Sequence, residues 1–304
     1  MARGTGYCRT HCHVQPRGRT TSIFGVVTGP DEVVGELVRA EALLRTLVPV
    51  ELPPCSLRLR KLKRYSAFYH GPRGITIDPS RDDIYGALMH ELGHFLDHVL
   101  TGSGPFLASE LAAEHFHARN FPSATRGAQA LAGWWEVMDA SQGVCKLRKR
   151  LTARAAIPLK PKERAVIRYL VNPSELFARS FCRWAAERTC DAELTVSTKT
   201  EPLHVWWSPD DFAPIAAELD ALFAADGAAI AMLNWCAEQR QALASSRHGP
   251  EAAVACHAQS KNATTRRGAH VAGLLSRTRS GTRGHLPALD DFNPVRASSA
   301  AGSE

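Results

Sequence analysis

The feature that most constrains this chain is the segment 84–100, which carries ionisable side chains within an apolar helix pattern. Its apolar residues recur every three or four positions, as on the inner side of a helix: Ile84, Leu88, Leu92, Phe95, Leu96 and Val99. Asp82 and Asp83 precede the segment, and Gly102 and Pro105 follow it, and these residue types begin and end helices. The segment therefore predicts a buried helix that presents reactive side chains.

Within this helix, His90, Glu91 and His94 form the pattern His-Glu-x-x-His. Two histidines four residues apart lie on one helix face about one turn apart, so both imidazoles can bind one zinc ion. Glu91 projects beside them, toward the position of a metal-bound water. The pattern therefore predicts a zinc site with Glu91 as the general base.

A catalytic zinc ion normally has a third protein ligand and keeps its fourth position for water. His98 is unsuitable, because eight helical residues separate it from His90 by about 12 Å along the axis. The metzincin pattern is excluded as well, since it requires Gly and His where this chain has Asp97 and Leu100.

The segment 172–181 is a better source of the third ligand. A helix is predicted to begin there at Pro173 or Ser174, and Glu175 lies in its first turn. The apolar residues that would pack this helix against the first one are Leu176, Phe177, Phe181 and Trp184. Glu175 is therefore a candidate for the third ligand.

The run HELGHFLD at 90–97, followed by the distant ELFARSF at 175–181, resembles the gluzincin-type zinc peptidases. It is most similar to the metallopeptidase-like domains of large polyvalent proteins of phages and mobile elements, and the similarity lies within 57–190. The resemblance implies a zincin-like fold, a zinc cofactor (Zn2+) bound by His90, His94 and Glu175, and hydrolysis of peptide bonds with Glu91 as general base.

Two further residues are placed to hold these ligands in position. Asp97 lies on the same helix face as His94, and Arg179 lies one turn beyond Glu175. Tyr169, six residues before Glu175, is the tyrosine we expect to stabilise the oxyanion of a peptide under attack. A strand at 65–70 or 75–78 that forms a sheet edge would hold an extended peptide by strand addition.

A second family places the third ligand elsewhere. The run HELGHFLDH also resembles intracellular metallopeptidases that cleave phage-type repressors, in which the third glutamate lies on the next helix. In this chain that ligand would be Glu110 or Glu114, within 109–121. The spacing suits this family and the composition of 175–181 suits the first, so both placements stay open, with Glu175 favoured.

The remaining patterns indicate an α+β fold. Residues 31–47 predict an amphipathic helix, and the segments 57–62, 65–70 and 75–78 predict a small antiparallel sheet. Helices dominate afterwards, at 107–118, 127–140, 163–171, 173–188, 211–224 and 226–244. We therefore expect one zincin-like domain over 31–244, with a helical insertion over 101–165.

Charge indicates the partners beyond a peptide substrate. The chain of 304 residues has a net charge of +7, yet 31–244 holds 25 basic and 26 acidic residues. The excess lies in 1–30 and 245–304, which we expect to be mostly disordered tails. Within 146–168, nine basic residues face Glu163 alone, which favours a nucleic acid or an acidic partner. The alternative to a peptidase is therefore an inactive zincin scaffold that binds nucleic acid or a protein.

The cysteines and the hydropathy indicate the location. The eight cysteines have no pairing rhythm, and neither an export signal nor a membrane-spanning run is present, so we expect reduced thiols, a cytoplasmic protein and no membrane contact. One cluster has metal-ligating chemistry but is tighter than usual zinc-ligand motifs: Cys8, His11, Cys12 and His13.

Overall fold

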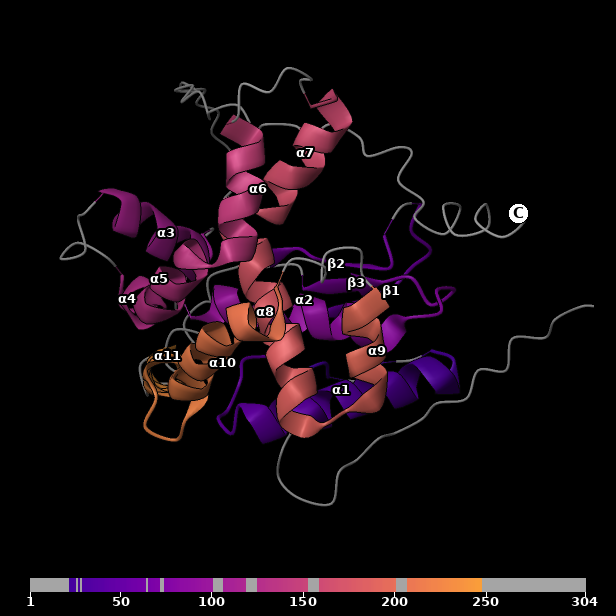
Figure 1. The fold of residues 1–304 in the computed structure, drawn as a ribbon. Coiled ribbons are helices and arrows are strands. Elements are labelled where there is room, and N and C mark those ends of the chain that lie inside the picture. The colour runs from indigo at the N-terminus through magenta and orange to yellow at the C-terminus, as the bar shows by residue number, and fades with distance from the viewer. Residues whose placement is uncertain are drawn as a thin grey trace, which may run out of the picture. The chain divides into compact units, whose positions relative to one another are not determined.

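The computed structural model describes residues 22–247, apart from positions 26, 28, 64, 72–73, 101–105, 119–124, 153–158 and 201–206 (Figure 1). The described residues up to Ala237 form one compact unit, and Glu238 begins a second, of which 238–247 are described. The first unit combines many helices with a three-stranded sheet. The predicted α+β class is confirmed.

The sheet is mixed, which corrects the prediction of an antiparallel one. Its strands are β1 (Leu57–Leu59), β2 (Ala67–Tyr69) and β3 (Ile75–Ile77), in the spatial order β1-β3-β2. β2 and β3 form an antiparallel hairpin, whereas β1 pairs in parallel with the other edge of β3. Residue alternation predicts strands but not which edge of a hairpin a third strand joins. β3 is consequently central and buried.

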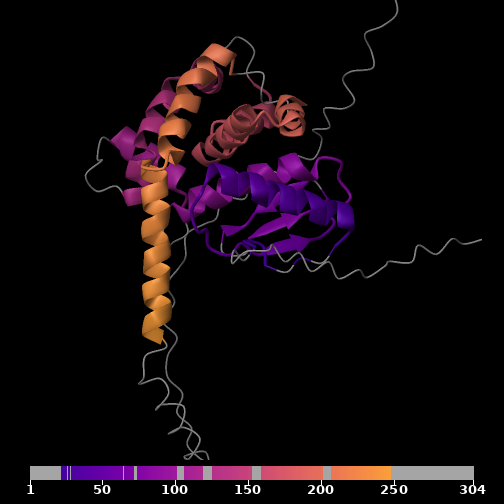
Figure 2. The ribbon, with the colours of Figure 1, turned by 90° about the horizontal axis from the view of Figure 1, so that it is seen from below.

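Helix α2 (Ile84–Val99) lies at the centre of the unit. It contacts β2 and β3 on one side and α8 (Pro173–Thr189) on the other. α1 (Asp31–Leu47) and α9 (Ala192–Thr200) also contact α2. Figure 2 shows the sheet, then α1 and α2, then α8 and α9 as successive layers. The residues of α2 are therefore surrounded by protein on both sides.

The other helices are α3 (Ala108–Ala118), α4 (Arg126–Ala130), α5 (Ala132–Ala140), α6 (Gln142–Thr152), α7 (Pro161–Leu170), α10 (Pro209–Phe223) and α11 (Ala228–Arg247). The predicted helix 127–140 is in fact two helices, α4 and α5, and Leu131 lies between them as the cap of both. Periodicity does not predict α6, which is rich in charge, or α9, which is rich in threonine; both depend on contacts with neighbouring helices. None of the described helices is both long enough and apolar enough to cross a bilayer.

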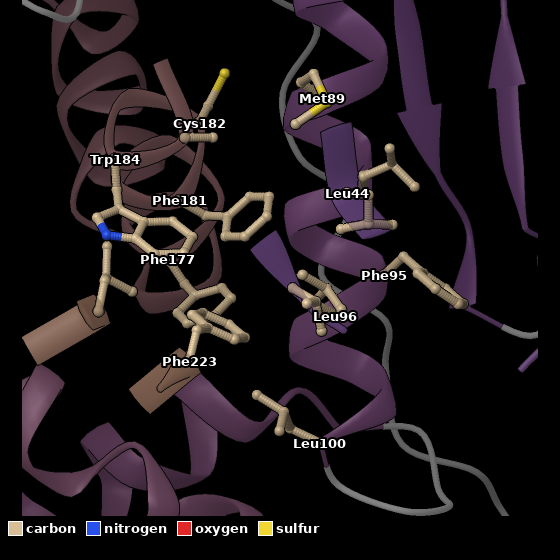
Figure 3. Close-up of a cluster of buried hydrophobic side chains, with 14 of the residues drawn as sticks. Leu44, Met89, Phe95, Leu96, Leu100, Phe177, Phe181, Cys182, Trp184 and Phe223 are labelled. Carbon is tan, nitrogen blue, oxygen red and sulfur yellow. The ribbon is translucent and has the colours of Figure 1, made fainter. Parts of the chain in front are cut away.

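The core between α2 and α8 is built from large apolar side chains (Figure 3). Leu96 of α2 and Phe177 and Phe181 of α8 are fully buried there. Phe181 extends the cluster to Phe223 of α10, with ring centroids 5.8 Å apart. Because such a core is close-packed, α8 has little freedom to slide along α2.

The folded part begins before the predicted boundary at residue 31. Ile23 and Phe24 are buried in the core, and the Ser22 hydroxyl and the Ile23 N–H donate to Glu41 of α1 at 2.6 and 3.0 Å. The sequence does not predict the burial of Ile23 and Phe24, because they are a short apolar pair within a basic segment. At the other end α11 continues to Arg247, past the expected limit of 244.

The predictions for the rest of both tails concern residues outside the described ones. They include the cluster Cys8, His11, Cys12 and His13 and everything after residue 247.

Burial within α1 predicts the effect of two aliphatic truncations. Leu44 is fully buried, whereas Val38 on the same helix is 44% exposed. Leu44→Ala should lower the free energy of unfolding by about 2–5 kcal/mol, because it leaves a cavity. Val38→Ala should change it by less than about 0.5 kcal/mol. Urea unfolding followed by circular dichroism measures both, and equal effects would contradict this placement of α1.

Candidate metal centre

Helices α2 and α8 come into backbone contact at Gly93. A Cβ atom on Gly93 would lie 2.8 Å from the Cα atom and 3.2 Å from the carbonyl oxygen of Ala178, closer than helices with larger residues can approach. Gly93 lies between His90 and His94 in sequence, and Ala178 follows Glu175 by three residues. The contact therefore brings the first turn of α8 beside both histidines.

The start of α8 is set by its own sequence. Asn172 is the N-cap, and its side-chain oxygen accepts from the N–H of Ser174 at 3.1 Å and from the Ser174 hydroxyl at 3.0 Å. Pro173 occupies the first helical position, which suits its fixed φ. The predicted helix start is confirmed, and it places Glu175 in the first turn, with its side chain buried against α2.

His90, His94 and Glu175 form a possible metal-binding triad. One ligand atom from each lies within 4.8 Å of the other two. The Nε2 atom of His90 is 3.5 Å from Oε2 of Glu175, and the Nε2 atom of His94 is 3.4 Å from Oε1. The sequence thus predicts residues that the fold brings together from positions more than 80 residues apart.

These distances fit a shared metal ion. Two donors that each bind a tetrahedral ion at about 2.1 Å lie about 3.4 Å apart, whereas an ordinary N–H···O hydrogen bond is about 2.9 Å long. The two imidazole rings are also nearly perpendicular, with centroids 4.9 Å apart, so both can direct a nitrogen to one point. The donor set, two imidazole nitrogens and one carboxylate, suits a divalent transition metal.

The Glu175 carboxylate is kept ionised. Burial opposes its ionisation, but the adjacent imidazoles of His90 and His94 outweigh burial and hold the pKa of Glu175 well below its usual value. Arg179, one turn later and almost fully buried, donates from Nη2 to Oε2 of Glu175 at 3.1 Å. Arg179 thus lies where the sequence expects it, against the carboxylate of the triad.

Glu91 lies beside the triad, is not part of the ligand group and is itself buried. Burial raises the pKa of its carboxyl group, the nearby His90 and His94 lower it, and Glu175 raises it further. The net direction is upward, so Glu91 holds a proton more readily than an exposed glutamate. This property suits a group that takes up and releases a proton during a reaction.

Tyr69 of β2 is the residue near the site that no sequence pattern indicates. Its backbone N–H is close enough to Glu91 to offset part of the rise in the pKa of that carboxyl group. Its hydroxyl forms a hydrogen bond with Nδ1 of His98 at 2.6 Å, so His98 contacts β2 and is outside the ligand group. The segment 65–70 predicts a strand, but alternation alone does not indicate which strand edge meets α2.

Asp97 makes its hydrogen bonds to α3. Its Oδ1 accepts from the N–H of Ser109 at 2.7 Å and its Oδ2 accepts from the Ser109 hydroxyl. Burial raises the pKa of Asp97 to about 7, although Ser109 and the nearby His94 both lower it. Asp97 thus joins the start of α3 to α2. Its role in orienting a ligand stays a prediction.

Tyr169 lies at the end of α7, beside the triad. The Arg179 guanidinium carbon is 5.2 Å from the centre of its ring. Burial, followed by the charge of Glu175, raises the pKa of the Tyr169 hydroxyl, which therefore stays protonated at neutral pH. The fold brings Tyr169 to the site, as the sequence predicts.

The rival ligands Glu110 and Glu114 belong to α3. Glu114 is exposed and Glu110 is half-buried, and the ligand group found among the described residues contains neither of them. The geometry therefore favours Glu175 over both.

No family model matches the chain, and neither does any curated protein or any solved structure.

The contact between α2 and α8 predicts opposite effects for two glycine substitutions. Gly93→Ala should lower the free energy of unfolding by about 1–3 kcal/mol and weaken metal binding, because the new methyl group pushes α8 from α2. Gly35→Ala on α1, where nothing lies within 4 Å of the added atom, should raise stability by up to about 1 kcal/mol. Urea unfolding and metal analysis after dialysis measure both effects. If the two variants behaved alike, the proposed contact would be wrong.

Proposed function

We propose that the protein is a zinc-dependent metallopeptidase with a zincin-like fold of the gluzincin type. The observation that carries this proposal is the convergence of His90 and His94 from α2 with Glu175 from α8, at the separations that a tetrahedral metal ion requires. The similarity of 90–97 and 175–181 to gluzincin-type peptidases supports the same conclusion.

The residues that would hold the metal are His90, His94 and Glu175, and zinc fits best because it prefers four-coordinate sites of this composition. When bound, zinc lowers the pKa of a coordinated water toward 7 and polarises the carbonyl group of the substrate. Three protein ligands leave one position for that chemistry, as in catalytic rather than structural zinc sites.

Glu91 is the general base in this proposal. Its carboxylate accepts a proton from the attacking water and then donates the proton to the leaving amine. Its burial beside the triad and its raised pKa suit both halves of this transfer. Arg179 keeps Glu175 in position, while the protonated Tyr169 hydroxyl would donate a hydrogen bond to the oxygen on which negative charge develops.

The edge of β2 that faces away from β3, which no described strand occupies, is the proposed binding surface for an extended peptide. Ser66 and His70, which flank β2, direct their backbone groups toward β3. The Ser66 oxygen accepts from the Asp78 N–H, and the His70 N–H donates to the Gly74 oxygen. The alternate residues Ala67 and Tyr69 therefore direct their backbone groups away from β3.

This assignment selects one of the two strands considered from the sequence. β3, the segment 75–78, is paired on both sides and cannot accept a further strand. β2 contacts α2, so a peptide paired with β2 would lie beside Glu91.

Two substitutions separate metal binding from catalysis. Glu91→Gln should keep about one zinc per chain and lower hydrolysis of fluorescein-labelled casein by at least about 100-fold, because the amide cannot accept the proton. Glu175→Ala should lose both zinc and hydrolysis, because two ligands bind zinc much more weakly than three. Zinc is measured by atomic emission after dialysis, and hydrolysis by release of fluorescent peptides.

The control is Glu114→Ala, which removes an exposed carboxylate of α3 and should keep both properties. Full zinc retention in Glu175→Ala would contradict the ligand assignment, and zinc loss in Glu114→Ala would favour the rival ligand. Hydrolysis that survives in Glu91→Gln would contradict the catalytic one.

A further inference from the structure

The hairpin of α6 and α7 is a strongly basic part of the structure, and the proposed peptidase uses none of its basic residues. α6 contacts α5 and α7, and α7 contacts α8; Figure 1 shows α6 and α7 side by side. The described residues 142–152 and 160–170 contain eight basic residues and one acidic residue, Glu163. The basic ones are Lys146, Arg148, Lys149, Arg150, Lys160, Lys162, Arg164 and Arg168. We call these two segments the basic hairpin.

Nearby carboxylates neutralise only part of this charge. Arg148 forms an ion pair with Asp139 of α5, and Arg150 forms one with Glu163 across the hairpin. Lys146, Lys149 and Arg168 are exposed and form no ion pair with the residues that the structure describes.

The basic residues are arranged in rows. On α6, Lys149 and Arg150 follow Lys146 by three and four residues, so the three lie on one helix face. Lys160, the N-cap residue of α7, is followed by the half-buried Arg164 and the exposed Arg168 at intervals of four residues, again along one face. Two neighbouring helices thus present rows of positive charge at a repeat of about 5–6 Å.

The rest of the domain is acidic by comparison. Within 31–244, the residues outside 142–170 comprise 16 basic and 25 acidic ones. A polyanion would therefore be repelled by most of the domain and attracted to the basic hairpin.

The surface chemistry favours nucleic acid over an acidic protein. Protein interfaces depend on aromatic and aliphatic anchors, whereas nucleic-acid binding is dominated by contacts between cations and phosphates. The large apolar residues that the described surface exposes are Val38, Tyr65, Phe106, Val196 and Leu243, and none of them is in the basic hairpin.

We infer that the basic hairpin binds the phosphate backbone of nucleic acid without reading its base sequence. α7 leads through Val171 and Asn172 directly into α8, which carries Glu175. The proposed nucleic-acid surface therefore lies next to the metal centre in sequence. The inference does not depend on peptide hydrolysis, since the basic residues of the hairpin are distinct from the triad, Glu91 and Tyr169.

The test is binding of the full chain to a fluorescein-labelled duplex DNA of mixed sequence, followed by anisotropy between 50 and 200 mM NaCl. The triple variant Lys146→Ala, Lys149→Ala, Arg168→Ala should bind at least about 10-fold more weakly at the lowest salt. Its slope of log affinity against log salt should fall by about 3, because each lost phosphate contact removes about 0.9. The single variant Lys149→Glu should also reduce the steepness of this salt dependence.

The matched control removes three exposed cations from the region of β1: Arg58→Ala, Arg60→Ala, Lys61→Ala. It should keep the wild-type slope, and circular dichroism should be the same for all variants. Equal losses in both triple variants would show that binding follows net charge alone and would overturn the inference. Unchanged DNA binding in the hairpin variants would overturn it too. The inference would also be wrong if the wild-type chain bound labelled polyglutamate more tightly than DNA and only the hairpin variants lost that binding.

Discussion

The candidate site depends on one close contact, between Gly93 of α2 and Ala178 of α8. Each residue of an α-helix turns by about 100° and rises about 1.5 Å. A shift of a single residue along α8 would therefore turn Glu175 away from His90 and His94. The small residues at the crossing, together with the aromatic cluster around Phe177 and Phe181, hold the two helices in the register that gives separations of 3.4 and 3.5 Å.

Neighbouring groups give the buried carboxylates of the site different pKa values. Glu91, Asp97 and Glu175 are all less than a tenth exposed, and a buried carboxylate without partners would be strongly destabilising. Burial would raise the pKa of Glu175, but His90 and His94 outweigh burial and lower it, and Arg179 donates a hydrogen bond to the same carboxylate. Asp97 has Ser109, and Glu91 has the histidines and the N–H of Tyr69, yet burial outweighs these partners and raises both pKa values. Glu175 is therefore suited to bind a cation, and Glu91 is suited to accept and release a proton.

The helices that carry the site were predictable because their patterns are local. The apolar repeat of 84–100 predicts α2, and Asn172 and Pro173 indicate the start of α8. The pattern of 90–94 gives His90 and His94, and the resemblance of 175–181 to gluzincin-type peptidases adds Glu175. Features that depend on contacts between distant segments could not be predicted. The order of the strands, the approach of Tyr69 to Glu91, and the burial of Ile23 and Phe24 all follow from tertiary packing.

The central claim is that a zinc ion binds between α2 and α8 through two imidazoles and one carboxylate. Zinc K-edge X-ray absorption of the full chain, loaded with one equivalent of zinc, tests it most directly. The account predicts only nitrogen and oxygen ligands at about 2.0–2.1 Å, with the outer-shell scattering of two imidazole rings. Sulfur ligands at about 2.3 Å would contradict it, because they would place the zinc at cysteines such as Cys8 and Cys12.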